Sequence, residues 1–373
     1  MNIACDARAL IGPATGVSVW TSKIMAGLAG AGDFRILLAA SKRFELPEEF
    51  KALPVDRLPV PRIPFPGTLW LHSVLPSLLG EADVFIGSLG VLPRRCPCPG
   101  IVMLHDLTPR THASRHTLAN RFCFNAYLEE SLDEAVAVVV GSESTRKLAL
   151  EYFPRIAPKL RTIGYGVDAF YRPPDEDERV AEGARIREKF SGGRPFILYL
   201  GTLEARKGLE TLLEAWEELR RQDSECPDLL FAGKEGWGLS PLFRRIESSP
   251  FKSRVHLPGY VSRNDARALM QHAELFVLPS EAEGFGLPLA EAIACGAPCV
   301  ASDIPALRES GGTAPEFVAP GDAGVLARAM EDALQPEVTA ELRRRSRERR
   351  ADLGWEHSVE KWADLLGKLQ HSI

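Results

Sequence analysis

One pattern occurs in both halves of the chain: a short apolar run, a glycine-containing turn, and then a segment with helical apolar spacing. It begins with residues 2–8 and the periodic segment 17–28, and it restarts with 195–200 and 201–221. Strands that alternate with helices are typical of parallel sheets, because parallel neighbours need a crossover connection. The pattern therefore predicts an α/β chain built from two parallel-sheet domains.

At 373 residues the chain is too long for one ordinary hydrophobic core, so two domains are expected. A polar, proline-broken stretch over 173–178 follows Gly164–Asp168 and indicates a boundary near these residues. We predict a first domain over 1–167 and a second over 168–354. Residues 355–373 form a final segment whose apolar spacing predicts a helix with tryptophans to bury.

Composition narrows the class of protein. The formal net charge of -5 gives no general case for nucleic-acid binding. Seven scattered cysteines include no C-x2-C pair, which disfavours a zinc site and favours reduced thiols. The segment Met1–Asp6 is expected to form a strand rather than a signal peptide, and no apolar stretch reaches the ~18 residues of a membrane span. We therefore expect a cytoplasmic protein whose membrane contact, if any, is peripheral.

The stretch 280–291 contains the strongest candidate site. The apolar run Leu275–Leu278 predicts a buried strand before it, and a helix is expected from Pro288 to about Cys295. A glycine turn before a helix N-terminus presents backbone amides and a positive dipole end to an anion. Glu283 in the turn and Glu291 on the helix could form a glycosidase pair, but a proline turn separates them. They are better interpreted as two contacts with one extended, negatively charged ligand.

A second anion-binding feature lies in Gly201–Gly208, after the strand predicted over 195–200. Arg206 and Lys207 are adjacent there, and they suit a diphosphate because arginine forms forked hydrogen bonds and lysine acts as a point charge. A leaving nucleoside diphosphate needs such neutralisation as charge builds on it. Divalent metal is the other way to supply it. No Asp-x-Asp follows a predicted strand, so a metal-independent site is predicted.

Three further features leave two interpretations open each. His105 follows the strand predicted over 100–104, where open α/β sheets bind ligands, and it is either functional or a hydrogen-bonded structural residue. A helix is expected over Leu69–Leu79, with Trp70 either in the core or in a membrane- or acceptor-binding patch. The basic helix expected over 337–350 is either a solvated face or attracted to anionic lipid.

In this order the motifs resemble the retaining glycosyltransferases of family 4, which have the GT-B fold. The resemblance is carried by Glu283-Gly284-Phe285-Gly286-Leu287-Pro288 with Glu291, Arg206-Lys207-Gly208, Gly164–Asp168, Gly259–Val261 and Pro298–Pro305. In the first half, the matches to the bacterial mannosyltransferase-like branch are Gly16, Trp70, His105–Leu107 and Ser142–Arg146. The resemblance covers essentially the full chain. It implies two Rossmann-like domains facing across a cleft, with a C-terminal helix that crosses back to the first domain.

The resemblance also implies a role for each matching residue. Glu283 would bind hydroxyl groups of the donor sugar near the reacting carbon, and Glu291 would bind the ribose hydroxyl groups. Arg206 and Lys207 would bind the diphosphate, and His105 would contact the transferred sugar on the acceptor side. The other implied donor-binding positions are Gly16 across the cleft, Gly201, Gly233, Tyr260, Gly284, Phe285, Gly286 and Leu287.

The reaction implied by the resemblance is retaining hexosyl transfer in bacterial surface polysaccharide or lipopolysaccharide synthesis. The segment Gly233–Gly238 resembles the branch that uses GDP-mannose, and another UDP- or GDP-linked sugar is the alternative donor. The acceptor would be a saccharide or lipid-linked saccharide, and no cofactor would be required. Retention in the family is ascribed to front-face attack, in which the leaving phosphate oxygen takes the acceptor proton.

Three rival functions fit parts of the pattern. A sugar-nucleotide epimerase of similar architecture would also bind a nucleoside diphosphate, but it would need acid/base groups at the sugar. A nicotinamide dehydrogenase is disfavoured because Gly12 and Gly16 do not form G-x-G-x-x-G. A catalytically idle partner subunit is disfavoured because Glu283, Glu291 and the Arg206–Lys207 pair are all present.

Overall fold

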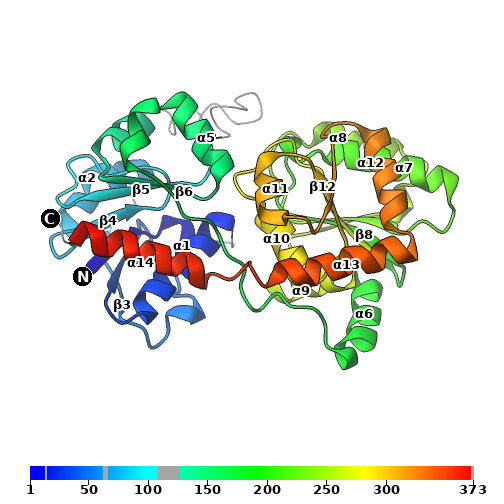
Figure 1. Cartoon of the computed structure of the whole chain (residues 1–373), viewed down its shortest axis with the longest axis horizontal. Helices are drawn as coiled ribbons and strands as arrows, with labels where there is room; N and C mark the ends of the chain where they lie inside the picture. Colours follow the sequence, from blue (N-terminus) through cyan, green and yellow to red (C-terminus); the bar gives the residue numbers. More distant parts are fainter. Residues whose placement is uncertain (13–14, 62–65, 108–126, 371–373) are drawn as a thin grey trace. The chain divides into compact units, whose positions relative to one another are not determined.

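The chain is described by a computed structural model that covers residues 1–12, 15–61, 66–107 and 127–370. It divides into two compact units (Figure 1). The first unit consists of Met1–Gly166 together with Trp355–Ile373, and the second consists of Val167–Gly354. The chain thus passes from the first unit to the second after Gly166, one residue before the predicted domain boundary. It returns to the first unit at Trp355, where the final segment was expected to begin.

The first unit contains a seven-stranded parallel sheet with the order β3-β2-β1-β4-β5-β6-β7. Its strands are β1 (Asn2–Asp6), β2 (Arg35–Ala39), β3 (Val55–Arg57), β4 (Val84–Gly87), β5 (Gly100–Leu104), β6 (Ala137–Val140) and β7 (Leu160–Thr162). Its helices are α1 (Gly16–Gly30), α2 (Gly67–Ser73), a helix over 127–134, α5 (Glu143–Tyr152) and α14 (Glu356–Gln370), with 3-10 turns at Arg8–Leu10, Glu48–Phe50, Leu75–Leu78 and Pro154–Lys159.

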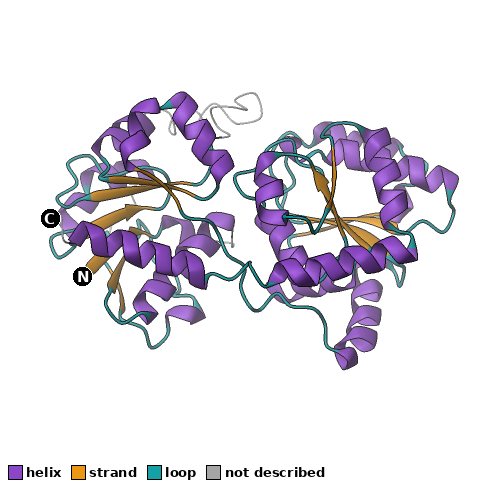
Figure 2. Ribbon diagram, in the orientation of Figure 1, coloured by secondary structure: helices purple, strands orange, loops and turns teal. Residues whose placement is uncertain are grey.

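Burial explains why the central strands of this sheet are almost wholly apolar. Every residue of β4, β5 and β6 is buried. Helices cover both faces of a parallel sheet, so each strand needs apolar side chains on both sides (Figure 2). Side chains on one face pack with α1 and α14, and those on the other pack with α2 and α5. Ser142 caps α5 by accepting a hydrogen bond from the Thr145 amide.

The C-terminal helix α14 belongs to the first unit and lies against α1 (Figure 1). Trp362 is fully buried and meets Trp20 of α1 edge to face, with ring centroids 5.6 Å apart. The Ser358 hydroxyl donates to the carbonyl oxygen of Gly164 at 2.7 Å. The crossing back of the final helix is therefore confirmed, and its apolar face completes the first core.

The second unit repeats the arrangement with a six-stranded parallel sheet of order β10-β9-β8-β11-β12-β13. Its strands are β8 (Phe196–Leu200), β9 (Asp228–Ala232), β10 (Val255–Gly259), β11 (Leu275–Leu278), β12 (Cys299–Ser302) and β13 (Glu316–Val318). Its helices are α6 (Glu176–Ser191), α7 (Leu209–Gln222), α8 (Ser240–Ser248), α9 (Arg263–His272), α10 (Leu287–Ala294), α11 (Pro305–Gly311), α12 (Ala323–Ala333) and α13 (Pro336–Arg350), with 3-10 turns at Ala205–Lys207 and Lys252–Arg254. The predicted α/β class with two parallel sheets is confirmed.

Two local predictions need correction. The segment Leu69–Leu79 is not one helix: α2 ends at Ser73 and a 3-10 turn, Leu75–Leu78, follows. Pro76 lacks an amide proton and clashes with a preceding helical turn, so the helix cannot continue through it. The polar stretch 173–178 was expected to be an irregular loop, but α6 begins within it, at Glu176.

Candidate functional site

The strand order of the second unit locates a natural ligand site. β8 has β9 on one side and β11 on the other, so the chain leaves β8 in one direction and later returns to its opposite edge. In open parallel sheets, ligands bind outside the carboxyl ends of the strands at such a switch point. The segment after β8 contains Arg206 and Lys207, and the segment after β11 contains Glu283. The two strongest motifs of the sequence therefore meet at one end of one sheet.

These residues form a compact ionic cluster. The Lys207 ammonium donates to Glu283 Oε1 at 2.6 Å, and the Ser280 hydroxyl donates to the same oxygen at 2.7 Å. Arg206 Nη1 lies 3.6 Å from Glu283 Oε2 and donates to the carbonyl oxygen of Ala282 at 2.8 Å. Arg206 Nε donates to Glu204 Oε2 at 2.9 Å. A carboxylate predicted to bind sugar and two cations predicted to bind phosphate are thus in direct contact.

The charges in this cluster determine each other's protonation. Burial alone would raise the pKa of Glu283, but the neighbouring Lys207 and Arg206 charges and the Ser280 hydrogen bond hold it below its usual value. Burial raises the pKa of Glu204, and the Arg206 charge opposes that effect. The Lys207 and Glu283 side chains are only 10% and 7% exposed. Two cations and two carboxylates are thus shielded together from water.

Two glycines permit the close approach that builds the cluster. Gly208 has φ +66°, and a Cβ there would lie 2.1 Å from the carbonyl oxygen of Pro279. Gly286 has φ +89°, and a Cβ there would lie 2.3 Å from Leu307 Cδ2. Both conformations and both contacts exclude a larger residue without rearrangement. Gly208 therefore lets the segment after β8 lie against the end of β11, and Gly286 lets the turn after β11 lie against α11.

Glu291 lies on α10 and contacts a different set of residues. It accepts a hydrogen bond from the Tyr171 hydroxyl, and the charges of Arg263 and Asp168 act on it. Burial, partly opposed by Tyr171 and Arg263, raises the pKa of Glu291 to about 7. Arg263 in turn forms an ion pair with Asp168 at 2.5 Å. The carboxyl group is therefore poised between its neutral and ionised forms near neutral pH.

The remaining donor-binding residues predicted in the second unit lie around the same end of the sheet. Gly201 and Gly233 follow β8 and β9, and a Cβ on Gly233 would lie 1.9 Å from the Gly201 carbonyl oxygen. Tyr260 follows β10 and is 58% exposed, so its ring is open to a ligand. The turn residues between β11 and α10 are Gly284, Phe285, which is buried, Gly286, and Leu287, which starts α10.

His105 and Gly16 belong to the first unit. Its switch point lies between β1 and β4, and His105 follows the next strand, β5. His105 Nδ1 lies 2.5 Å from the Tyr165 hydroxyl, and Nε2 lies 2.7 Å from the Ser88 carbonyl oxygen. Burial lowers the pKa of His105 to about 4. Gly16 is the first residue of α1, directly after its cap Thr15.

Sequence reasoning did not single out several side chains that contact the predicted residues. Ser280 and Glu204 lie inside motifs that were recognised, so their neighbourhood was a usable signal. Tyr165 lies in the recognised segment Gly164–Asp168. Tyr171 carries no such signal, because its contact with Glu291 spans 120 positions of the chain (171 to 291) and depends on the folded unit.

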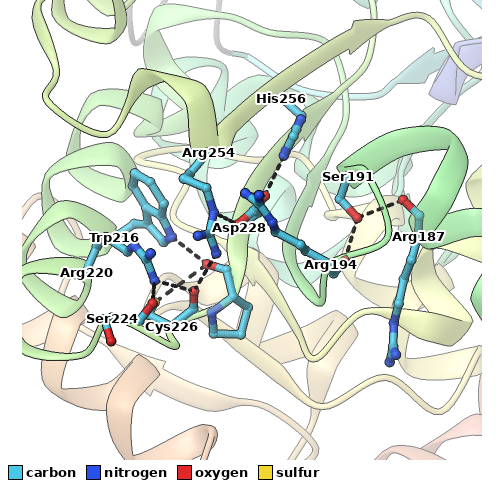
Figure 3. A network of polar contacts seen from close by, with 11 residues as sticks. Arg187, Ser191, Arg194, Trp216, Arg220, Ser224, Cys226, Asp228, Arg254 and His256 are labelled. Atoms are coloured by element: carbon cyan, nitrogen blue, oxygen red, sulfur yellow. Dashed lines mark hydrogen bonds and ion pairs between the residues drawn. The ribbon is translucent and has the colours of Figure 1, made fainter.

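A second polar cluster lies at the opposite end of the second sheet (Figure 3). Asp228, the first residue of β9, is fully buried, forms an ion pair with Arg254 and is hydrogen-bonded to His256 Nε2 at 2.8 Å. Arg194 Nη1 lies 3.9 Å from the same carboxylate. The amino ends of parallel strands are not where such sheets bind ligands, so this cluster is interpreted as a structural anchor between β9 and β10.

Two other candidates from the sequence have structural explanations. Trp70 is fully buried and so cannot form an exposed patch. Four arginines of the basic helix α13 have partners within the protein: Arg344 and Arg345 pair with Glu341, Arg349 pairs with Asp352, and Arg343 donates to the carbonyl oxygens of Ala273 and Gly296. The sequence interpretation of a solvated face with ion pairs fits these contacts.

Within the described residues there is no group of three or more His, Cys, Asp or Glu side chains that could hold a metal ion. Cys123 lies outside the described residues, and the other six cysteines are free thiols. Among the helices that the structure describes, none is long and apolar enough to cross a membrane.

Comparison with known proteins finds a similarity to one enzyme family in the second unit. Residues 182–352 match the family model described as glycosyl transferases group 1. The chain is 28% identical to O-antigen chain mannosyltransferase B of Escherichia coli over 259 residues, which cover 69% of this chain and 67% of that protein. It is 29% identical over 287 residues to the serotype-specific mannosyltransferase WbdA of Escherichia coli, which covers 75% of this chain but only 34% of WbdA.

Two further similarities concern the donor and the fold. The GDP-mannose-dependent alpha-(1-6)-phosphatidylinositol monomannoside mannosyltransferase of Mycolicibacterium smegmatis is 29% identical over 266 residues, 68% of this chain and 66% of that one. The crystal structure of Anabaena HepE in complex with UDP and glucose superposes with a TM-score of 0.78 at 17% identity, covering 98% of this chain and 99% of that one. At that identity the second similarity concerns the fold alone.

Proposed function

We propose that the chain is a group 1 glycosyltransferase, as the match over residues 182–352 supports, and that it transfers a hexose from a nucleotide-sugar donor to a saccharide or lipid-linked saccharide. The observation that carries this proposal is the buried cluster of Arg206, Lys207 and Glu283 at the switch point of the second sheet. Such a cluster combines cations for a diphosphate with a carboxylate for sugar hydroxyl groups, within one hydrogen-bonded unit.

The donor that we propose is GDP-mannose. The names of the similar mannosyltransferases support mannose, and one of them names GDP-mannose as its donor. The alternative is a UDP-linked sugar, and the crystal structure of HepE, a protein with this fold, contains UDP and glucose. The O-antigen function of the first relative supports an acceptor in bacterial surface polysaccharide or lipopolysaccharide synthesis. A cytoplasmic enzyme, with peripheral contact to the inner face of the membrane, fits that acceptor.

In this proposal each residue acts through the chemistry of its own side chain. Arg206 and Lys207 bind the diphosphate and stabilise the charge that develops as the bond to the sugar breaks, without a metal ion. Glu283 accepts hydrogen bonds from sugar hydroxyl groups through Oε2, because Oε1 already accepts from Lys207 and Ser280. Glu291 accepts from the ribose hydroxyl groups, and the exposed ring of Tyr260 lies at the same end of the sheet for contact with the base.

The remaining assignments follow from the family resemblance. Transfer is proposed to retain the anomeric configuration of the donor, with the leaving phosphate taking the acceptor proton. His105 and Gly16 are assigned to the first unit's side of the reaction. Retention is checked by the one-bond ¹³C–¹H coupling at the anomeric carbon of the product. An inverted product would contradict the family mechanism but would not contradict the donor-site assignment.

A melting-shift screen with GDP, UDP, ADP and their sugar derivatives tests the donor. A ligand at 100 times its Kd stabilises the protein by about 2.7 kcal/mol, which corresponds to roughly 5–10 °C for a unit of this size. We expect GDP and GDP-mannose to give the largest shift, followed by transfer of mannose to a surface-polysaccharide acceptor. A larger shift with UDP would select the alternative donor. Epimerisation of the donor without acceptor would contradict the transferase assignment and favour a sugar-nucleotide epimerase.

The variant Glu283→Gln tests the site itself. Gln keeps an oxygen that can accept from Ser280 and Lys207 but removes the charge, so the fold is retained and transfer is expected to fall roughly 10²–10³-fold. Glu281→Gln, two positions away in the same turn, is the matched control and should transfer normally. Near-normal turnover of Glu283→Gln with unchanged melting would refute the role of Glu283.

A further inference from the structure

A chain of hydrogen bonds runs through His105 and ties four strand ends of the first sheet together. The Tyr165 hydroxyl, beyond β7, meets His105 Nδ1 at 2.5 Å, and His105 Nε2 meets the Ser88 carbonyl oxygen, beyond β4, at 2.7 Å. The Ser88 hydroxyl donates to the carbonyl oxygen of Asp6, the last residue of β1, at 2.5 Å. His105 thus lies at the switch point of the first sheet with both ring nitrogens engaged.

The partners determine which nitrogen carries the proton. A carbonyl oxygen can only accept, so Nε2 must donate to Ser88 and therefore bears hydrogen. In the neutral ring Nδ1 is then an acceptor, and the Tyr165 hydroxyl donates to it. Burial lowers the pKa of His105 to about 4, and it outweighs the Ser88 carbonyl oxygen and the Asp106 charge, which both favour the protonated ring. Burial thus favours the neutral ring, and the two hydrogen-bond partners then fix its tautomer.

Tyr165 is itself held tightly. Its ring packs against Gly141, where a Cβ would lie 1.9 Å from Tyr165 Cε2. On another side the ring meets Trp355 edge to face, with centroids 6.2 Å apart. Trp20 packs edge to face on His105 with centroids 5.2 Å apart. The tyrosine therefore has little freedom to leave the histidine, and the histidine has little freedom to turn.

We propose that Tyr165 is the positioning residue for His105: with Ser88 it fixes the ring as the neutral tautomer that bears hydrogen on Nε2. His105 then presents a fixed, uncharged surface to the sugar site and does not act as an acid or base. The contact of His105 with sugar rests on the proposed function. The tautomer itself is a property of the first unit alone.

The experiment reads the tautomer directly, by ¹H–¹⁵N long-range correlation spectra of the histidine rings of the full chain, with His105→Gln used to assign the signal. In the wild type we expect a single neutral form with hydrogen on Nε2, which does not titrate above about pH 5. Tyr165→Phe removes only the hydroxyl. Loss of its hydrogen bond to the neutral ring is expected to raise the titration midpoint by about one pH unit and to mix the two tautomers.

Two further variants sharpen the test. Gly141→Ala pushes the Tyr165 ring aside without touching His105, so it should reproduce the spectrum of Tyr165→Phe. Tyr152→Phe removes a hydroxyl from an exposed tyrosine and should leave the His105 signal unchanged. If Tyr165→Phe retains the wild-type tautomer and titration, the positioning role is wrong, whatever the enzyme's activity.

Kinetics then separate this inference from the proposed function. With a donor found by melting shift, Tyr165→Phe should lower kcat about tenfold and leave the donor KM unchanged, because the side chains assigned to the diphosphate and the ribose lie in the second unit. An altered tautomer with normal kcat would overturn the role of His105 at the sugar. An altered tautomer in a protein that transfers no sugar would confirm the positioning role and refute the proposed function.

Discussion

At the scale of single residues, Glu291 is a carboxyl group whose surroundings oppose its ionisation. Burial raises its pKa to about 7, although Tyr171 donates to it and Arg263 lies nearby. A carboxyl group with a raised pKa binds its proton more tightly in the folded state than in the unfolded state. Its ionisation therefore costs folding free energy as the pH rises from about 4.5 to about 7, and the whole cost is present above pH 7.

The variant Glu291→Gln should remove this cost. We expect it to stabilise the ligand-free protein by about 1–2 kcal/mol at pH 8, a few degrees in Tm, and to have almost no effect at pH 4.5. Donor affinity should fall at the same time, because the amide is a weaker acceptor for ribose hydroxyl groups. Thermal melts at both pH values check the prediction, with Glu331→Gln on the exposed face of α12 as the control. Equal Tm changes at pH 8 and pH 4.5 would contradict it.

Asp228 presents the opposite case, a buried carboxylate that its partners require. Removing its charge leaves Arg254 beside β9 without its buried counter-charge. We expect Asp228→Asn to destabilise the protein by about 3–5 kcal/mol, as is usual when one partner of a buried ion pair is removed. Asp364→Asn, which breaks an exposed pair with Lys368 on α14, should change stability by less than about 1 kcal/mol. Urea unfolding of both variants decides whether burial makes this difference.

At the scale of elements, the turn between β11 and α10 depends on Gly286. Its φ of +89° is left-handed, and a Cβ would lie 2.3 Å from Leu307. Gly286→Ala should therefore displace α10 from α11, lower stability by roughly 2–4 kcal/mol and weaken donor binding. Gly321 has a similar φ of +82° with open space around it, so Gly321→Ala measures the backbone strain alone. If the two variants melt alike, the contact with Leu307 has no influence on the turn.

Such elements also show what a sequence can predict. The segments Gly201–Gly208 and 280–291 were recognised because a strand, a glycine turn and a helix start are local patterns, and strand order then brings them together. Glu291 was recognised for the same reason, but its partner Tyr171 was not. The residues next to Tyr171 in the sequence do not indicate that its hydroxyl contacts a carboxyl group far along the chain.

Local sequence also leaves two interpretations of Trp70 and of His105, because the contacts that decide between them come from distant residues. Trp70 has the helical spacing of both a core residue and a surface patch, and only the packing of α2 shows that it is buried. His105 could be functional or structural from its place after β5. Its two hydrogen bonds come from residues beyond β4 and β7, which the sequence orders but does not pair.

At the scale of the whole molecule, the two units differ in continuity. The second unit is one uninterrupted stretch, Val167–Gly354, with its own sheet and with every donor-site residue of the ionic cluster. The first unit is interrupted, because its core needs α14 from the end of the chain. Without α14 the buried side chains Trp20 and Ile24 of α1 would lose part of their cover. Independent folding should therefore be possible for the second unit and not for residues 1–166.

We expect the fragment 167–354 to unfold cooperatively and to show a melting shift with the same nucleotide that stabilises the full chain, but to transfer no sugar. Residues 1–166 alone should be unfolded or molten. The same segment joined to 355–373 by a short Gly/Ser linker should fold, since the Tyr165 and Trp355 rings at the junction lie 6.2 Å apart. Circular dichroism melts of the three proteins, with and without nucleotide, test this division. Cooperative unfolding of 1–166 without α14 would show that the final helix is dispensable. The ionic cluster of Arg206, Lys207 and Glu283 is complete within the second unit. A fragment 167–354 that folds but shows no melting shift with the nucleotide would therefore show that donor binding requires more than this cluster and depends on the first unit.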